Sequence, residues 1–127
     1  YTDRNVFAKM LFLEKKMSSI EWHIYNTWFD EFSSLCRNIK IIYIRTSPEI
    51  CDSRIKQRAR KGETIPFEYL QKCDYYHDSW LNNQEKINNK EVLIINGNED
   101  TNKSLFIQNN FYNDIMKNLL QFINFNQ

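Results

Sequence analysis

The sequence has 127 residues, a hydrophobic share of 42% and a formal net charge of +1, so its length allows one domain at most. A nearly neutral chain creates no long-range field for nucleic acid or an anionic membrane, and no apolar run reaches membrane-spanning length. We therefore expect neither nucleic-acid nor membrane partners. Three widely spaced cysteines without a CxxC pattern favour a reducing, intracellular setting, which we place in the cytoplasm, with a mitochondrial or virus-encoded origin left open.

The first half of the chain predicts two helices and a strand. Apolar residues recur at helical spacing over residues 4–17. Ser18 or Ser19 can cap a second helix, with Glu21 in its first turn, and that helix carries a broad apolar stripe. Residues 41–44 form a short apolar run typical of a strand that is buried on both faces. We expect the three tryptophans to lie in the core.

The second half predicts three more helices and another buried strand. Thr46-Ser47-Pro48-Glu49 is a strong helix start, because a hydroxyl residue can cap and proline fits the first turn. We expect that helix to run to about Arg60, before Gly62. The later elements are expected as a helix over 67–87, a strand over 91–95, a turn over 96–98 and a closing helix over 103–123.

This order of elements defines an α/β fold whose parallel strands are joined by crossovers. Two strands that are buried on both faces cannot form a stable sheet by themselves. We therefore expect residues 1–127 to be the C-terminal part of a larger single domain.

A dense group of cations follows the first strand. Five of the eight residues over 54–61 are cationic, and Arg54 and Arg58 lie one helical turn apart, where like charges repel. One interpretation is a solvated helix face near a helix C-terminus. The other is an anion site, since the planar guanidinium suits phosphate oxygens. The position of the group, after a strand and a capped helix and before Gly62, favours a mobile lid over about 54–65.

The first residues offer a second candidate site. Asp3 precedes Phe7 by about one helical turn, so a carboxylate and an aromatic ring lie near each other. Such a pair can accept a hydrogen bond from an amino group and stack on a planar ring. The alternative is an N-capping aspartate beside a core phenylalanine. The carboxylates show no metal-ligand spacing, so no metal site is predicted, and His23 and His77 are interpreted as structural.

The sequence lacks the phosphate cradle GxxxxGK[ST]. Its two glycines, Gly62 and Gly97, do not stand in that pattern, which needs glycines so that backbone N–H groups converge on the phosphates. The chain by itself is therefore not expected to hold a nucleoside triphosphate in the usual way.

Several ordered motifs resemble the cellular and viral deoxynucleoside kinases. Residues 1–9 (YTDRNVFAK) are similar to the segment just after that family's Glu-Arg-Ser motif. The motifs that follow it in the same order are IEWHIY over 20–25, IIYIRTSPE over 41–49, the cationic lid with Glu63, IPFEYL over 65–70, and His77 with Trp80-Leu81. The resemblance implies a P-loop kinase-like three-layer fold with a parallel sheet, to which this chain supplies roughly two strands and the helices around them.

The resemblance also implies an activity and a role for each site residue. It implies ATP-dependent phosphorylation of the 5′-hydroxyl of a deoxynucleoside in nucleotide salvage, with Mg²⁺, by a homodimer. The implied roles are charge neutralisation for Arg54, Arg58 and Arg60, sugar 3′-hydroxyl binding for Glu63, base stacking for Phe7, base amino-group recognition for Asp3, and donor-adenine contact for Asp100 and Thr101. Because thymidine-preferring relatives tend to have a small residue at the position of Asp3, deoxycytidine or a purine deoxynucleoside is the expected acceptor.

Two alternatives stay open at this point. One is a nucleoside monophosphate kinase, which shares a fold and an arginine lid. The other is a truncated, inactive chain that acts only as a binding or interaction module. The resemblance to deoxynucleoside kinases implies that residues 1–127 alone are inactive, because most ATP-binding and Mg²⁺-binding groups would lie upstream.

Overall fold

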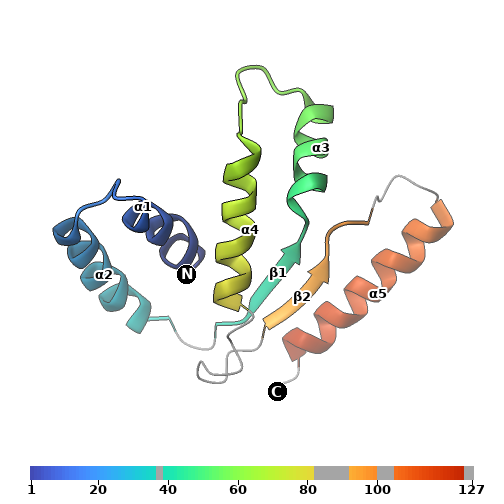
Figure 1. The fold of residues 1–127 in the computed structure, drawn as a ribbon. Helices are drawn as coiled ribbons and strands as arrows, with labels where there is room; N and C mark the ends of the chain where they lie inside the picture. The colour runs from blue at the N-terminus through green and yellow to red at the C-terminus, as the bar shows by residue number, and fades with distance from the viewer. Residues whose placement is uncertain (37–38, 82–91, 100–104, 125–127) are drawn as a thin grey trace.

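The computed structural model describes residues 1–36, 39–81, 92–99 and 105–124. The elements are η1 (Asp3–Ala8), α1 (Lys9–Leu13), α2 (Ser19–Ser34), β1 (Ile41–Arg45), α3 (Pro48–Arg58), α4 (Phe67–Leu81), β2 (Val92–Asn96) and α5 (Leu105–Asn124) (Figure 1). Each expected helix and strand has a counterpart in this order. The parts of the expected elements that fall on residues 82–91 and 103–104 lie outside the described residues.

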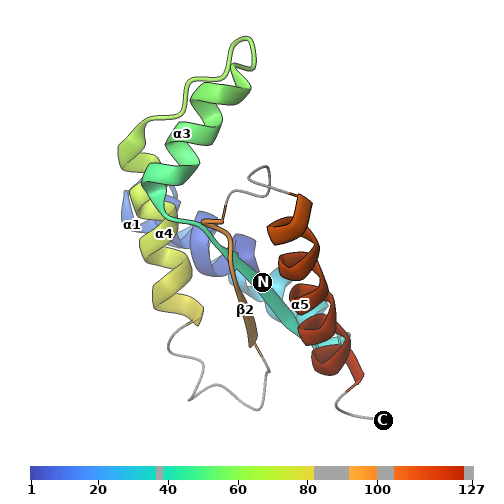
Figure 2. The ribbon, with the colours of Figure 1, turned by 90° about the vertical axis from the view of Figure 1, so that its right-hand side faces the viewer.

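The two strands form a parallel sheet in a single register. Ile41 pairs with Val92, and the pairing continues to Arg45 with Asn96. Helices α4 and α5 lie on opposite faces of this sheet (Figure 2). The described residues thus form the expected helix–sheet–helix layers of an α/β fold.

Burial of the strands on both faces, as expected from their composition, is not reached in this chain. Ile42 is 45% exposed, Ile44 65% and Ile94 48%. Side chains alternate between the two faces of a strand, and a single helix on each face covers only part of them. The expectation of full burial is therefore wrong for the chain by itself.

The first expected helix is shorter than its periodicity indicated. Its first part, η1, is a π-helix, and α1 ends at Leu13 instead of residue 17. Lys15 adopts a positive φ of 58°, and the Lys16 N–H donates to the Leu11 carbonyl oxygen at 2.9 Å. This left-handed residue closes the helix, as residues after helix C-termini often do.

Helix α2 begins as expected but does not bury its apolar stripe. Ser18 and Glu21 form a complete capping box, with the Ser18 hydroxyl accepting from the Glu21 N–H at 3.2 Å and the Glu21 carboxylate accepting from the Ser18 N–H at 2.7 Å. Ile24, Trp28 and Phe32, however, are 51–60% exposed. The expectation that all tryptophans lie in the core is wrong for Trp28, because α2 packs on η1 and α1 through a different side.

Helix α3 differs from expectation at both ends. Ser47 occupies the N-cap position, but its hydroxyl makes no capping hydrogen bond. The helix ends at Arg58, because Ala59 adopts a left-handed conformation with φ 46° and ψ 43°, so Arg60 lies beyond it. The loop that follows joins α3 to α4, and this helical hairpin projects beyond the sheet in both ribbon views (Figures 1 and 2).

The fully buried apolar residues gather where η1 and α1 meet α4. Val6, Ala8, Met10 and Leu81 are at most 4% exposed. Helix α4 packs against η1 on one side and α3 on the other. It therefore sets the position of both candidate sites. None of the described helices combines the length and the apolar composition needed to cross a membrane.

Candidate functional site

The cationic lid consists of the last turns of α3 and the loop after it. Arg54 and Arg58 lie on the helix, whereas Arg60 lies in the loop, past the left-handed Ala59. Gly62 adopts φ 81°, a conformation that costs glycine little, and a Cβ there would meet no atom within 4 Å. The left-handed backbone conformations of Ala59 and Gly62 therefore shape the loop.

Two of the predicted lid residues are in direct contact. The Arg58 guanidinium donates through Nη2 to both carboxylate oxygens of Glu63, at 2.5 and 2.6 Å. The Glu63 side chain is 17% exposed and that of Arg58 is 49% exposed. The contact places a guanidinium, which can bind phosphate oxygens, beside a carboxylate, which can accept a hydrogen bond from a hydroxyl group. The linear spacing of the two residues did not show this contact.

Arg54 is held differently. Its Nη2 donates to the backbone carbonyl oxygen of Glu99 at 3.0 Å, so it ties α3 to the segment after β2. The side chain of Cys51 lies one turn earlier on the same helix, and burial raises the pKa of its thiol, partly offset by the charge of Arg54. All three cysteines, Cys36, Cys51 and Cys73, are free thiols.

The second candidate site lies on the π-helix η1. Asp3 is exposed and accepts a hydrogen bond from the Tyr25 hydroxyl at 2.5 Å. Partial burial, followed by this hydrogen bond to a carboxylate, raises the pKa of Tyr25 to about 12. Asp3 is the first residue of η1 and Thr2 occupies the N-cap position, so the alternative interpretation of Asp3 as an N-cap is wrong. π-helical turns often occur at functional sites.

Phe7, one turn after Asp3, faces α4. Its ring meets His77 edge-on at 6.2 Å between centroids, and His77 stacks on Tyr43 of β1 at 5.6 Å. The Nδ1 atom of His77 lies 2.6 Å from the Cys73 carbonyl oxygen, which confirms its interpretation as a structural residue. Phe7 is 36% exposed, so part of its ring is free to contact a ligand.

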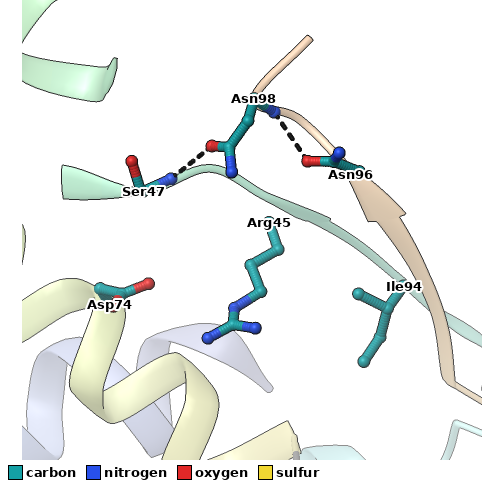
Figure 3. Close-up of a pocket in the computed structure, with 6 residues that line it drawn as sticks. All are labelled: Arg45, Ser47, Asp74, Ile94, Asn96 and Asn98. Carbon is teal, nitrogen blue, oxygen red and sulfur yellow. Dashed lines mark hydrogen bonds between the residues drawn. The ribbon is translucent and has the colours of Figure 1, made fainter. Parts of the chain in front are cut away.

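A polar cavity of about 460 Å³ opens where both strands end (Figure 3). It is lined by Arg45, Ser47, Asp74, Ile94, Asn96 and Asn98. Arg45 forms an ion pair with Asp78 of α4. Burial and the neighbouring Asp78 charge raise the pKa of Asp74. In parallel α/β sheets, ligands bind at this edge, outside the carboxyl ends of the strands.

The predicted site residues therefore fall into two separate groups. Arg58 meets Glu63 on the lid, and Asp3 and Phe7 share η1, with α4 packed between the two groups. Asp100 and Thr101 lie outside the described residues. Among the described residues, no three or more His, Cys, Asp or Glu side chains gather in a way that could hold a metal ion.

Sequence reasoning missed the residues that hold these groups in place. Tyr25 binds Asp3 across 22 positions and Asn98 binds Ser47 across 51 positions. Tyr43 and Arg45 both contact Asp78 of α4. None of these pairs follows a helical or strand period, so the linear pattern carried no signal for them.

A parallel sheet lies between helices, and an arginine-bearing helical hairpin and a cavity lie at the carboxyl end of its strands, which is the edge where parallel α/β sheets bind ligands. The family model for deoxynucleoside kinases matches residues 1–124. The chain belongs to the deoxynucleoside kinase family.

Individual relatives agree with this assignment. The mitochondrial deoxyguanosine kinase of Xenopus laevis is 37% identical over 111 residues, which cover 79% of this chain and 42% of the relative. Human deoxycytidine kinase is also 37% identical over 111 residues, with 79% and 43% covered. A probable deoxycytidine kinase of fowlpox virus is 36% identical over 124 residues, with 91% and 52% covered. The chain thus spans about half the length of the curated relatives it matches, or less.

Proposed function

We propose that the protein to which this chain contributes transfers the γ-phosphoryl group of ATP to the 5′-hydroxyl of a deoxynucleoside, in nucleotide salvage. The observation that carries the proposal is the contact between Arg58 and Glu63 on the lid. Phosphoryl transfer needs cations against the transferring group, and a carboxylate beside them can hold the acceptor sugar. The family membership of the chain supports the same activity.

In this proposal the lid arginines act on the phosphates. Arg58 and Arg60 would donate to the oxygens of the transferring phosphoryl group, and Arg54, at the base of the lid, would complete the positive field. Glu63 would accept a hydrogen bond from the sugar 3′-hydroxyl. Because Arg58 and Glu63 are paired in the structure, ligand binding would exchange their mutual contact for two contacts with substrates.

The acceptor base would lie against η1. Phe7 would stack on the base with the exposed part of its ring, and the Asp3 carboxylate would accept from an exocyclic amino group. Cytosine, adenine and guanine carry such an amino group, and thymine does not. We therefore propose deoxycytidine or a purine deoxynucleoside as the preferred acceptor, as the names of the relatives also suggest.

We propose that residues 1–127 form the C-terminal part of one kinase domain and are inactive by themselves. The half-exposed strand faces support this, since the helices that accompany further parallel strands would cover them, and so does the coverage of the relatives. The sequence has no GxxxxGK[ST], so most contacts to ATP would come from elsewhere. Asp100 and Thr101 would face the donor adenine. The described residues do not form a Mg²⁺ cage, so the ion would be held by the ATP phosphates and by groups outside them.

We also propose that the protein is a homodimer. The exposed apolar face of α2, defined by Ile20, Ile24, Trp28, Phe32 and Leu35, is the surface in the described chain that supports this. Contiguous apolar patches of this kind mark interaction sites.

The experiment that tests the function uses the full-length protein with ATP, Mg²⁺ and each of the four deoxynucleosides in turn. We expect 5′-monophosphates of deoxycytidine or of the purine deoxynucleosides, separated and quantified by chromatography. Phosphorylation of thymidine alone would contradict the role of Asp3. Phosphorylation of none of the four, or of monophosphates only, would contradict the proposed activity.

A further inference from the structure

Two turns of the chain meet at the carboxyl end of the sheet. One is the passage from β1 into α3 over residues 45–47, and the other follows β2 over residues 96–99. The Gly97 N–H donates to the Arg45 carbonyl oxygen at 2.7 Å, which extends the parallel ladder beyond the strands. The close-up shows the Asn98 side chain reaching across from the second turn to the first (Figure 3).

The approach of the two backbones depends on Gly97. A Cβ at this position would overlap the Thr46 Oγ1 atom and lie 2.9 Å from Ile44 Cγ2 and 3.0 Å from the Arg45 carbonyl oxygen. Such overlaps force neighbouring atoms to move. The glycine therefore allows the second turn to lie directly on the start of α3.

Asn98 uses this proximity to hold Ser47, the N-cap residue of the lid helix α3. Its Oδ1 accepts a hydrogen bond from the Ser47 N–H at 2.8 Å. Its own N–H donates to the Asn96 Oδ1 at 3.0 Å, which fixes the turn that presents the side chain. Ser47 is the N-cap of α3 and its hydroxyl makes no capping hydrogen bond, so the bond from its N–H to Asn98 is a side-chain contact that fixes this residue.

A second bond fixes the same helix further along. The Arg54 guanidinium donates to the Glu99 carbonyl oxygen, one residue after Asn98. The start of α3 and its second turn are thus both attached to one four-residue turn. Because α3 carries Arg54 and Arg58, the orientation of this helix decides where the lid cations lie.

We propose that Asn98 is a positioning residue for phosphoryl transfer. It fixes the start of the lid helix, α3, and so orients the arginines of that helix toward the donor phosphates. The proposal rests on the proposed kinase function. Asn98 need not touch either substrate in this role. It acts through the Ser47 N–H, and the property that matters is a hydrogen-bond acceptor at its Oδ1 position.

The test compares two substitutions in the full-length protein. Asn98→Leu keeps the size of the side chain and removes the acceptor, whereas Asn98→Asp keeps an acceptor oxygen. For Asn98→Leu we expect kcat/KM for ATP to fall on the order of ten-fold, because small misplacements of a reacting constellation are costly. The KM for the deoxynucleoside should change less than about two-fold, because η1 is held by other contacts. Asn98→Asp should recover most of the loss.

The matched control is Ser53→Ala on the same helix. Ser53 is exposed and precedes the cationic lid, so this substitution should leave kcat/KM for ATP unchanged. Thermal unfolding of each variant shows whether a loss is only a loss of stability. Equal loss in Asn98→Leu and Asn98→Asp, or parallel changes in both KM values, would overturn the positioning role. An inactive wild-type protein would instead contradict the proposed function.

Discussion

At the scale of single residues, the contact between Arg58 and Glu63 joins two charges with different proposed tasks. One guanidinium nitrogen of Arg58 contacts both carboxylate oxygens of Glu63. The Arg58 side chain is about half exposed, however, and exposed ion pairs contribute only about 0–1 kcal/mol to stability. Arg60 forms no ion pair within the described part of the chain. We therefore expect neither arginine to be needed for stability. The lid interpretation and the solvated-face interpretation then differ in the loss of activity that they predict when either arginine is removed.

We predict that Arg58→Ala and Arg60→Ala in the full-length protein lower kcat by about 10²–10³-fold, the usual effect of removing one group that stabilises transition-state charge. The free energy of unfolding should change by less than about 1 kcal/mol. Steady-state kinetics and urea unfolding measure the two quantities. Lys61→Ala, a neighbouring cation without an assigned role, is the control. A loss of activity that merely follows a loss of stability would favour a solvated helix face.

At the scale of elements, the capping box of α2 is a local device with a pH signature. The Ser18 N–H, and then the Ser18 hydroxyl, lower the pKa of Glu21 below its usual 4.5. A carboxylate whose pKa is lower in the folded than in the unfolded state stabilises the fold above the unfolded value. This contribution is lost as the pH falls below about 4.5 and through the lowered pKa of the folded protein.

We predict that Ser18→Ala lowers the free energy of unfolding by about 1 kcal/mol near neutral pH, as loss of an N-cap commonly does. Glu21→Gln removes the titrating group, so its stability should fall less steeply than that of the wild type as the pH drops below about 4.5. Urea unfolding of the full-length protein at a series of pH values measures both effects. Glu31→Gln, which removes a carboxylate of the same helix outside the box, is the matched control.

At the scale of elements, the sequence predicted the features whose signal lies within one helix or strand. The Ser18–Glu21 spacing predicted the start of α2, and the apolar run over 41–44 predicted β1, because each signal lies within one element. The end of α1 was missed because Lys15, which is not a glycine, takes the left-handed conformation. The start of α3, with Ser47 as N-cap and Pro48 in the first turn, was predicted correctly, but the contact of Ser47 with Asn98, 51 residues away, was not. Periodicity likewise identified the apolar face of α2, but it gave no information about the surface that this face contacts.

At the scale of the whole molecule, the unburied face of α2 contrasts with its packed side. Trp22 stacks on Phe12 at 4.9 Å and the Tyr25 hydroxyl donates to Asp3 at 2.5 Å, so the helix is already attached to α1 and η1. Trp28 and Phe32 stack on each other at 5.6 Å outside that contact. A cavity of about 350 Å³, lined mainly by aromatic side chains, opens beside them. A second copy of the same face could fill it, as two-fold interfaces are self-complementary.

We predict that Trp28→Glu converts the proposed dimer of the full-length protein to a monomer. Trp28 is 60% exposed in the single chain, so a charge there costs the monomer little, whereas burying that charge twice in a two-fold interface is strongly unfavourable. Central aromatic residues of interfaces commonly contribute about 2 kcal/mol or more when truncated. Light scattering during size-exclusion chromatography at micromolar concentration measures the mass directly.

The control for this prediction is His23→Glu, which adds the same charge to the same helix. His23 is also exposed and lies about 140° around the helix axis from Trp28, since successive residues advance by about 100°. It should leave the dimer intact. A dimer that persists in Trp28→Glu but is lost in His23→Glu would move the interface to another side of α2. Loss of neither would place the contact between subunits on a different element, and the exposed aromatic face would then need another occupant.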